Sequence, residues 1–155
     1  YKTYKYLSAL TDTYMFYRIE RYDVKGKEYL KTGGKCYAVD IGLRKTVIGN
    51  KYTEMGHVLE NIVYLELLRR WGEVYVGKVD NMEIDFVAIQ DGEPCYYQVA
   101  YTVIGDDGAI LKRELAPLKK VRDFNQRYLI TMDMAPPMSH DGIRQIYALD
   151  WLLGD

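Results

Sequence analysis

A long apolar segment from Thr53 to Trp71 most constrains what this chain can fold into. Between Val58 and Leu68, only two glutamates and one asparagine interrupt the apolar residues. Thr53 is suited to cap a helix, Gly72 to end it, and the two arginines before Trp71 suit the negative end of a helix dipole. The segment therefore predicts one long helix that is mostly buried against a larger structure.

Three strand-like runs follow this helix in close succession. We expect them at Glu73–Gly77, Met82–Ile89 and Cys95–Val103. The turn residues Gln90–Pro94 join the last two, which favours a meander of neighbouring strands.

A second helix is expected at Lys112–Phe124, with Pro117 near its first turn and one apolar stripe that ends at Phe124. Two further strands at Tyr128–Thr131 and Ile143–Leu149 and a last helical turn at Asp150–Leu153 complete this part. The order of elements predicts an α/β fold with a mixed sheet flanked by helices over residues 46–155.

Residues 1–45 have a different pattern. A short helix at Lys2–Leu10, a strand at Tyr14–Tyr22 and a strand at Lys35–Val39 after Gly33–Gly34 match the second half of a winged-helix module. The alternative is a simple helix-and-hairpin decoration of the main domain. Since the chain opens at Tyr1 in helix-like sequence, we expect it to be a piece of a longer protein.

Composition excludes several classes of function. The net charge of -1 gives no overall field that would draw the chain to nucleic acid or to a membrane, and no apolar run reaches the roughly 20 residues of a membrane span. Cys36 and Cys95 lie in apolar runs, which predicts buried thiols and a reducing compartment, the cytoplasm. The sixteen tyrosines favour sheet cover, with base stacking as the alternative.

Acidic residues mark the first candidate site. Glu60 lies on the apolar helix, where an unpaired charge is costly, and Glu83 and Asp85 lie on one side of a strand because residues two apart face alike. Glu60 and Asp85 are therefore candidate ligands of a hard cation such as Mg²⁺ or Mn²⁺. The alternative is a structural network of hydrogen bonds.

The helix with Glu60, the strand with Ile84-Asp85-Phe86 and the strand with Gln98-Val99-Ala100 together resemble the PD-(D/E)XK nuclease core. This resemblance implies a restriction-endonuclease-like fold, with Glu60, Asp85 and Gln98 as the catalytic metal ligands. It also implies that a lysine should stand where this chain has Ala100, while Gln98 replaces an acid. Loss of such a preorganised charged group commonly costs about 100- to 1,000-fold in rate, so we expect a degenerate site. Lys78 is an alternative source of the lysine.

An ordered set of segments resembles, more specifically, the uncharacterised C-terminal domain of prokaryotic AAA-type ATP-binding proteins. The segments are Lys35–Arg44, Gly56–Asn61, Glu83–Val87, Tyr97–Val99, Arg113–Leu115 and Asp141–Ile143. The resemblance implies a preceding P-loop ATPase domain and winged helix. Because this chain has no G-x-x-x-x-G-K-[ST] motif, ATP is expected to bind only to that other domain.

Basic residues form the second candidate site. They cluster on or beside the second helix, at Lys112, Arg113, Lys119, Lys120 and Arg122. They predict a surface that contacts the phosphates of DNA, and the alternative is an ordinary solvated helix face.

We therefore expect an accessory domain of an AAA-type ATPase that binds nucleic acid or another protein without being an enzyme itself. The alternatives are a divalent-metal-dependent DNA endonuclease and a structural domain that forms a homo-oligomer. The expected partners are the parent ATPase domain and DNA, with no membrane partner.

Overall fold

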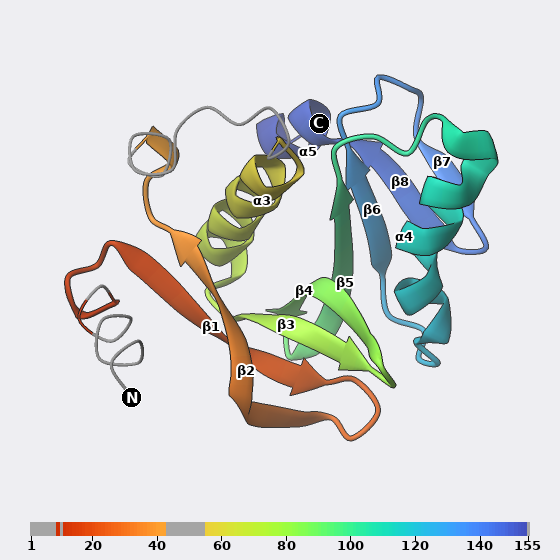
Figure 1. The fold of residues 1–155 in the computed structure, drawn as a ribbon. Helices are drawn as coiled ribbons and strands as arrows, with labels where there is room; N and C mark the ends of the chain where they lie inside the picture. The colour runs from red at the N-terminus through yellow and green to blue at the C-terminus, as the bar shows by residue number, and fades with distance from the viewer. Residues whose placement is uncertain (1–8, 10, 43–54, 155) are drawn as a thin grey trace.

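The computed structural model describes residues 9, 11–42 and 55–154, with the backbone alone for residues 31–33. These residues form an eight-stranded mixed sheet with helices packed on both of its faces (Figure 1). The predicted mixed α/β architecture is confirmed. The expected N-terminal helix lies almost entirely outside the described residues. Thr53, the expected cap of the long apolar helix, also lies outside them.

The elements follow one another along the chain in an order close to the predicted one. They are β1 (Phe16–Asp23), β2 (Glu28–Ala38), α3 (Met55–Trp71), β3 (Val74–Val79), β4 (Met82–Gln90), β5 (Glu93–Ala100), η2 (Asp106–Gly108), α4 (Ala109–Lys120), β6 (Arg127–Thr131), β7 (Met138–His140), β8 (Ile143–Tyr147) and α5 (Ala148–Leu153). Across the sheet the strands are ordered β2-β1-β3-β4-β5-β6-β8-β7. The predicted meander is confirmed as β3, β4 and β5, which pair antiparallel, and β6 pairs parallel with β5.

The second helix differs from its prediction. It begins at Ala109 and ends at Lys120, because Val121 has extended backbone angles and turns its side chain into the core. Pro117 therefore lies in the helix interior rather than in the first turn, and Phe124 is fully exposed rather than part of an apolar stripe. The buried apolar residues thus continue to Val121, one residue beyond the helix, and do not include Phe124.

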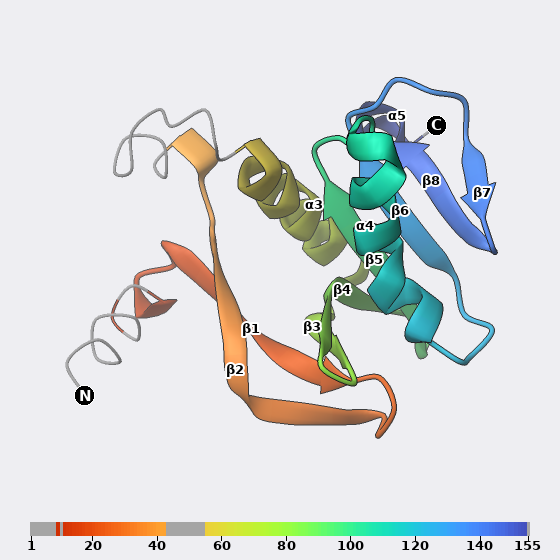
Figure 2. The same cartoon turned by 45° about the vertical axis from the view of Figure 1, so that its right-hand side comes forward.

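The helices cover opposite faces of the sheet (Figure 2). Phe86 and Tyr97 pack with the apolar residues of α3, whereas Val87 and Tyr96, their neighbours along the same strands, pack with those of α4. This alternation is the period of two expected for a sheet that is buried on both sides. Within the part of the chain that the structure describes, no helix is both long and apolar enough to cross a membrane.

The N-terminal hairpin continues this sheet. Strand β1 pairs antiparallel with β2 and parallel with β3, with Arg21 opposite Val76. Hydrogen bonding to the main sheet fits the alternative of a decoration of the main domain. The predicted division near residue 45 remains a prediction, because residues 43–54 are outside the described ranges.

A large bulge bends β2 sharply (Figure 1). Ile19 pairs with Lys35 and Arg21 with Leu30, so Glu20 alone faces residues 31–34 of β2. A Cβ atom at Gly34 would lie 2.1 Å from the carbonyl oxygen of Ile19, so only glycine fits this close approach. The bulge redirects the strand directly before Lys35.

Asn61 joins α3 to the end of β2. Its side-chain oxygen accepts a hydrogen bond from the Ala38 amide, and its nitrogen donates to the Ala38 carbonyl, both at 2.9 Å. The side chain is 3% exposed. Asn61 therefore substitutes for a β-ladder partner at the point where β2 ends.

Substituting Asn61 with alanine should lower the free energy of unfolding by about 2 kcal/mol, because two buried backbone groups lose their partners. Chemical denaturation of the two proteins measures the difference. The matched control is Asn125→Ala, which removes a loop amide near the surface and should have a much smaller effect. An equal loss in both variants would contradict this role for Asn61.

Candidate functional site: an acidic cluster around Lys35

A lysine from β2 lies at the centre of the predicted acidic cluster. The Lys35 ammonium is 3.0 Å from Glu60 Oε1, 2.7 Å from Glu83 Oε1 and 3.8 Å from Asp85 Oδ1. Tyr37, two residues later on the same side of the strand, donates a hydrogen bond of 2.5 Å to Glu60. The Glu60 and Asp85 side chains are only 14% and 13% exposed. The predicted meeting of Glu60 with the acids of β4 is therefore observed, with a cation between them.

Asp85 lies where β4 bulges. Tyr75 pairs with Val87 and Gly77 with Ile84, so Val76 alone faces both Asp85 and Phe86. A Cβ atom at Gly77 would lie 2.8 Å from the Ile84 side chain, so this glycine allows the close packing beside the bulge.

Strands β4 and β5 stop pairing at the same point. The ladder runs as far as Phe86 opposite Tyr97, and beyond it a side chain replaces the backbone partner. Asp85 Oδ2 accepts a hydrogen bond of 2.9 Å from the Val99 amide. The carboxylate therefore occupies the opening between the two strands.

Gln98 contacts the same opening through its amide. Its oxygen accepts a long 3.4 Å hydrogen bond from the Asp85 backbone amide, and its nitrogen donates at 3.1 Å to Glu114 of α4. Ala100 packs against the apolar cluster on the α4 face. The position where the resemblance implies a lysine thus holds a methyl group, and the ammonium group comes from β2 instead.

The charges within the cluster are largely balanced. Glu83 also forms a 2.7 Å ion pair with Arg21, and Glu60 Oε2 lies 3.5 Å from His57 Nδ1. Burial raises the pKa of Glu60, but Lys35 and the Tyr37 hydroxyl outweigh it, so the pKa is below its usual range. Burial lowers the pKa of Lys35, but Glu60, Glu83 and Asp85 together hold it above its usual range. Both groups are therefore charged near neutral pH.

Asp85 is the exception among the acids. Burial, with the neighbouring charge of Glu60, raises the pKa of Asp85 to about 7, although Lys35 and the Val99 amide oppose the shift. Burial next to Glu60 also raises the pKa of Tyr37, so its hydroxyl stays protonated and can donate. The pair of Glu60 and Asp85 carries close to two negative charges only above neutral pH.

The carboxylate oxygens of Glu60 and Asp85 are the type of ligand that Mg²⁺ and Mn²⁺ prefer. No group of three or more acidic, histidine or cysteine side chains in the described parts of the chain is arranged to hold a metal ion. A divalent cation between Glu60 and Asp85 would repel the Lys35 ammonium and would have to replace its ion pairs. The cluster is arranged around an ammonium ion.

A pocket of about 280 Å³ opens beside the cluster. Its lining is Lys35, Cys36, Tyr37, His57, Glu60 and Asn61. Cys36 is exposed here, which corrects the prediction that both thiols are buried; only Cys95 is buried, since alternate residues of β2 face outward. Glu60 and Lys35 are thus accessible from solvent on one side.

The predicted basic group is divided by the structure. Arg113 forms an ion pair with its neighbour Glu114, and Lys119 forms one with Asp141, which lies between β7 and β8. Lys112 lies on the first half of α4. Lys120 and Arg122 line a separate pocket with residues of the β1–β2 turn. The five residues therefore do not act as one surface.

The sequence prediction missed Lys35 and Glu114 as members of the site. Lys78, the alternative lysine, forms no ion pair with any of the side chains that the structure describes. Lys35 and Tyr37 share one face of β2 directly after Gly33–Gly34, and this was the available signal. A lysine and a tyrosine on the core-facing side of a strand need buried partners.

Comparisons with known proteins give one relative. The chain is 42% identical over 149 residues to an uncharacterised protein of Haemophilus influenzae. The match covers 96% of this chain and 36% of the relative. No family model and no solved structure matches the chain. The chain thus corresponds to little more than a third of the curated relative that it matches.

Proposed function

We propose that this chain is a nuclease-like accessory domain that binds nucleic acid without cleaving it. The observation that carries the proposal is the ammonium group of Lys35 among Glu60, Glu83 and Asp85. In a PD-(D/E)XK nuclease, acids at such positions hold a metal ion. Here a lysine balances the acids, which supports a nuclease-like domain that lacks the metal's chemistry.

The order of elements supports the nuclease-like part of the proposal. Helix α3, the meander β3–β5, helix α4 and the parallel strand β6 follow one another as the resemblance implies. Asp85 and Gln98 lie where β4 and β5 separate. The Lys35 ammonium group contacts the carboxylates of both Glu60 and Asp85 and so links Glu60 to this opening. By the resemblance, Glu60, Asp85 and Gln98 correspond to the metal ligands of the family, and their positions support the proposal.

Two side chains support the absence of cleavage. Ala100 offers no ammonium group at the position of the catalytic lysine, and the Gln98 amide is hydrogen-bonded to Glu114. Lys35 is engaged in ion pairs with three carboxylates and is not free to orient a water molecule. Without a metal and a free lysine, the attack of water on a phosphodiester has no electrostatic support.

The parent protein is the third part of the proposal. The relative is nearly three times as long as the matched region. The remainder of a protein of that length is large enough to contain a P-loop ATPase domain. We propose that this domain belongs to a cytoplasmic AAA-type ATPase and that ATP binds only to the other part. Its direct partners are then the ATPase domain and DNA.

A second candidate function is a divalent-metal-dependent DNA endonuclease. It is favoured by one observation, the 3.8 Å distance between the Lys35 ammonium and Asp85 Oδ1. If a metal displaced Lys35 from Glu60, this lysine would still lie beside Asp85. Glu60, Asp85 and Gln98 would then be the metal ligands.

The two candidates predict opposite results in one experiment. Purified chain is incubated with labelled DNA and Mg²⁺ or Mn²⁺, and cleavage and retention of the DNA are followed on the same gels. The proposed function predicts retention with no cleavage above that of the Asp85→Asn variant. Cleavage that Asp85→Asn and Lys35→Met both abolish, while Asp141→Asn does not, would establish the endonuclease instead.

A further inference from the structure

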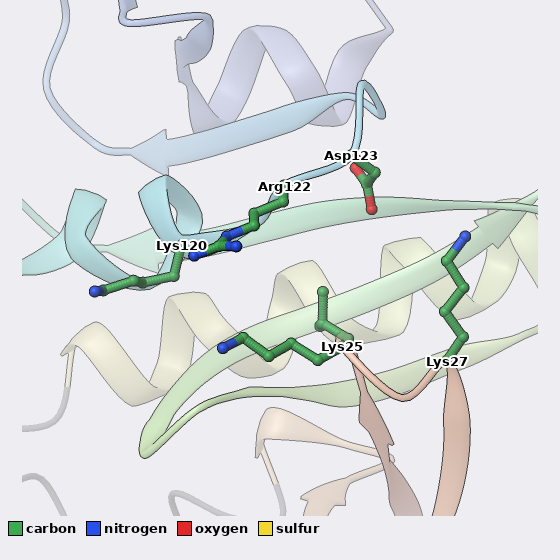
Figure 3. Close-up of a pocket in the computed structure, with 6 residues that line it drawn as sticks. Lys25, Lys27, Lys120, Arg122 and Asp123 are labelled. Atoms are coloured by element: carbon green, nitrogen blue, oxygen red, sulfur yellow. The ribbon is translucent and has the colours of Figure 1, made fainter.

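We infer that a basic pocket between the β1–β2 turn and the end of α4 binds the phosphates of a single-stranded nucleic acid; this rests on the proposed function. The pocket has a volume of about 400 Å³. It is lined by Val24, Lys25, Lys27, Lys120, Arg122 and Asp123. Figure 3 shows the lysines of the turn and the two cations at the end of α4 on opposite sides of this space.

The pocket gathers positive charge from two distant segments. Four cationic side chains face one carboxylate, and the two segments are nearly one hundred residues apart in the chain. Lys25 forms an ion pair with Asp80. Lys27, Lys120 and Arg122 form no ion pair with the side chains that are described. Like charges brought together without partners repel one another, so the arrangement favours an anionic ligand.

The pKa of Asp80 shows the effect of these positive charges. Its pKa is below the usual range, first because of the hydrogen bond from Lys25 and then because of the charges of Lys25, Lys120 and Arg122. The cations of both segments thus act on one nearby carboxylate. They would act in the same way on a phosphate oxygen that enters the pocket.

Asp123 offsets one of the four positive charges, and hydrogen bonds hold its side chain in place. One of its carboxylate oxygens accepts a hydrogen bond of 2.6 Å from the Tyr96 hydroxyl, and the other accepts one of 3.0 Å from the Asn125 amide. Arg127 also donates to the Asp123 carbonyl at 2.7 Å. This residue therefore anchors the segment that carries Arg122, and its side chain is turned to these partners.

The opposite rim is also held in place by hydrogen bonds. Asp23 accepts hydrogen bonds from the Lys25 and Gly26 amides, and the Val24 amide donates at 2.9 Å to the Lys78 carbonyl of β3. The turn that presents Lys25 and Lys27 is thus fixed to the sheet. A pocket with two fixed rims loses little entropy when it binds.

Exposed aromatic side chains that neighbour the pocket residues in the sequence favour a single strand. Phe124, directly after Asp123, is fully exposed, and Tyr29, two residues after Lys27, is 54% exposed and packs on Tyr75 at 4.8 Å between ring centroids. Single-stranded nucleic acids bind where cations follow the backbone and exposed rings stack on bases. A duplex would keep its bases stacked internally and would leave Phe124 without a role.

Fluorescence anisotropy with a labelled oligothymidylate tests the inference on the intact chain. The double variant Lys120→Ala/Arg122→Ala should bind roughly tenfold more weakly at moderate salt and lower the slope of log affinity against log salt by about 0.7 per removed cation. Lys27→Ala/Arg122→Ala should behave alike, because it removes one cation from each rim. The matched control Lys112→Ala/Lys119→Ala removes two charges from the same helix outside the pocket and should leave binding nearly unchanged. All five substituted residues are exposed, so circular dichroism should show intact folds.

A further variant tests the choice of a single strand. Phe124→Ala should weaken binding of the oligothymidylate and leave the salt slope unchanged, because stacking involves no counterion release. Preferred binding of duplex DNA with no effect of Phe124→Ala would overturn this choice. If the oligothymidylate binds but the control pair weakens it as much as the pocket pairs, the inference fails and the proposed function stands. No binding of any nucleic acid by the wild type would overturn both.

Discussion

The Asp85→Asn variant should become progressively more stable than the wild type as the pH increases from 4 to 7. Burial raises the pKa of Asp85 from its ordinary 3.8 to about 7. The folded state therefore binds a proton in this window that the unfolded state has released, and the wild type loses stability as the pH rises through it. Asparagine is neutral throughout and keeps an oxygen that can accept from the Val99 amide.

The difference should grow by about 3 kcal/mol between pH 5 and pH 8, because the pKa of Asp85 lies about two units above pH 5 and each pKa unit corresponds to about 1.4 kcal/mol. Urea denaturation of both proteins at pH 5 and pH 8 measures it. Asp141→Asn, at an exposed carboxylate whose pKa is lowered, should differ from wild type by the same amount at both pH values. An Asp85→Asn difference that does not depend on pH would contradict the raised pKa.

Substituting Lys35 with methionine should destabilise the protein by about 3 kcal/mol at pH 8, because it leaves half-buried and buried carboxylates without their cation. The loss should be smaller at pH 5, since Asp85 is then protonated and repels Glu60 less. Lys35→Arg should recover part of the stability because it restores the charge. Denaturant unfolding at the two pH values gives both numbers.

The matched control is Lys119→Met, which removes a lysine whose ion pair with Asp141 is exposed to solvent. Surface ion pairs contribute little, so this change should have a small effect at either pH. If the losses in Lys35→Met and Lys119→Met were equal, the acids would not depend on Lys35. The cluster would then be balanced by Arg21 and by protons.

The regular elements of the fold were predictable because their patterns are strong and local. The spacing of apolar and acidic residues predicts the buried helix α3 and the meander β3–β5. It also predicts that Glu83 and Asp85 lie on the same side of β4. The boundaries of α4 were less predictable. Val121 continues the apolar spacing but is extended, and no local pattern separates a last helical residue from a first buried loop residue.

The source of the ammonium group could not be predicted, because it depends on contacts between distant parts of the chain. Lys35 reaches Glu60 only because a bulge at residues 31–34 bends β2, and the parallel pairing of β1 with β3 brings the hairpin beside the acids. A sequence pattern gives the spacing along one strand and not the partner of that strand. The same holds for the basic pocket, where the turn at Lys25 and Lys27 meets the end of α4.

The two sites divide the proposed function between them. In this proposal the acids around Lys35 correspond to a nuclease centre with a cation in place of its metal, whereas Lys27, Lys120 and Arg122 of the basic pocket contact a phosphate backbone. Binding without cleavage requires this separation.

Calorimetric titration of Mn²⁺ into the wild-type chain tests the central claim most directly, because Mn²⁺ and the Lys35 ammonium compete for the same carboxylates. We predict no saturable binding in the wild type, and a site that appears in Lys35→Met and disappears again when Glu60→Gln is added. A saturable Mn²⁺ site in the wild type that Glu60→Gln abolishes would contradict the claim that Lys35 takes the place of a metal ion.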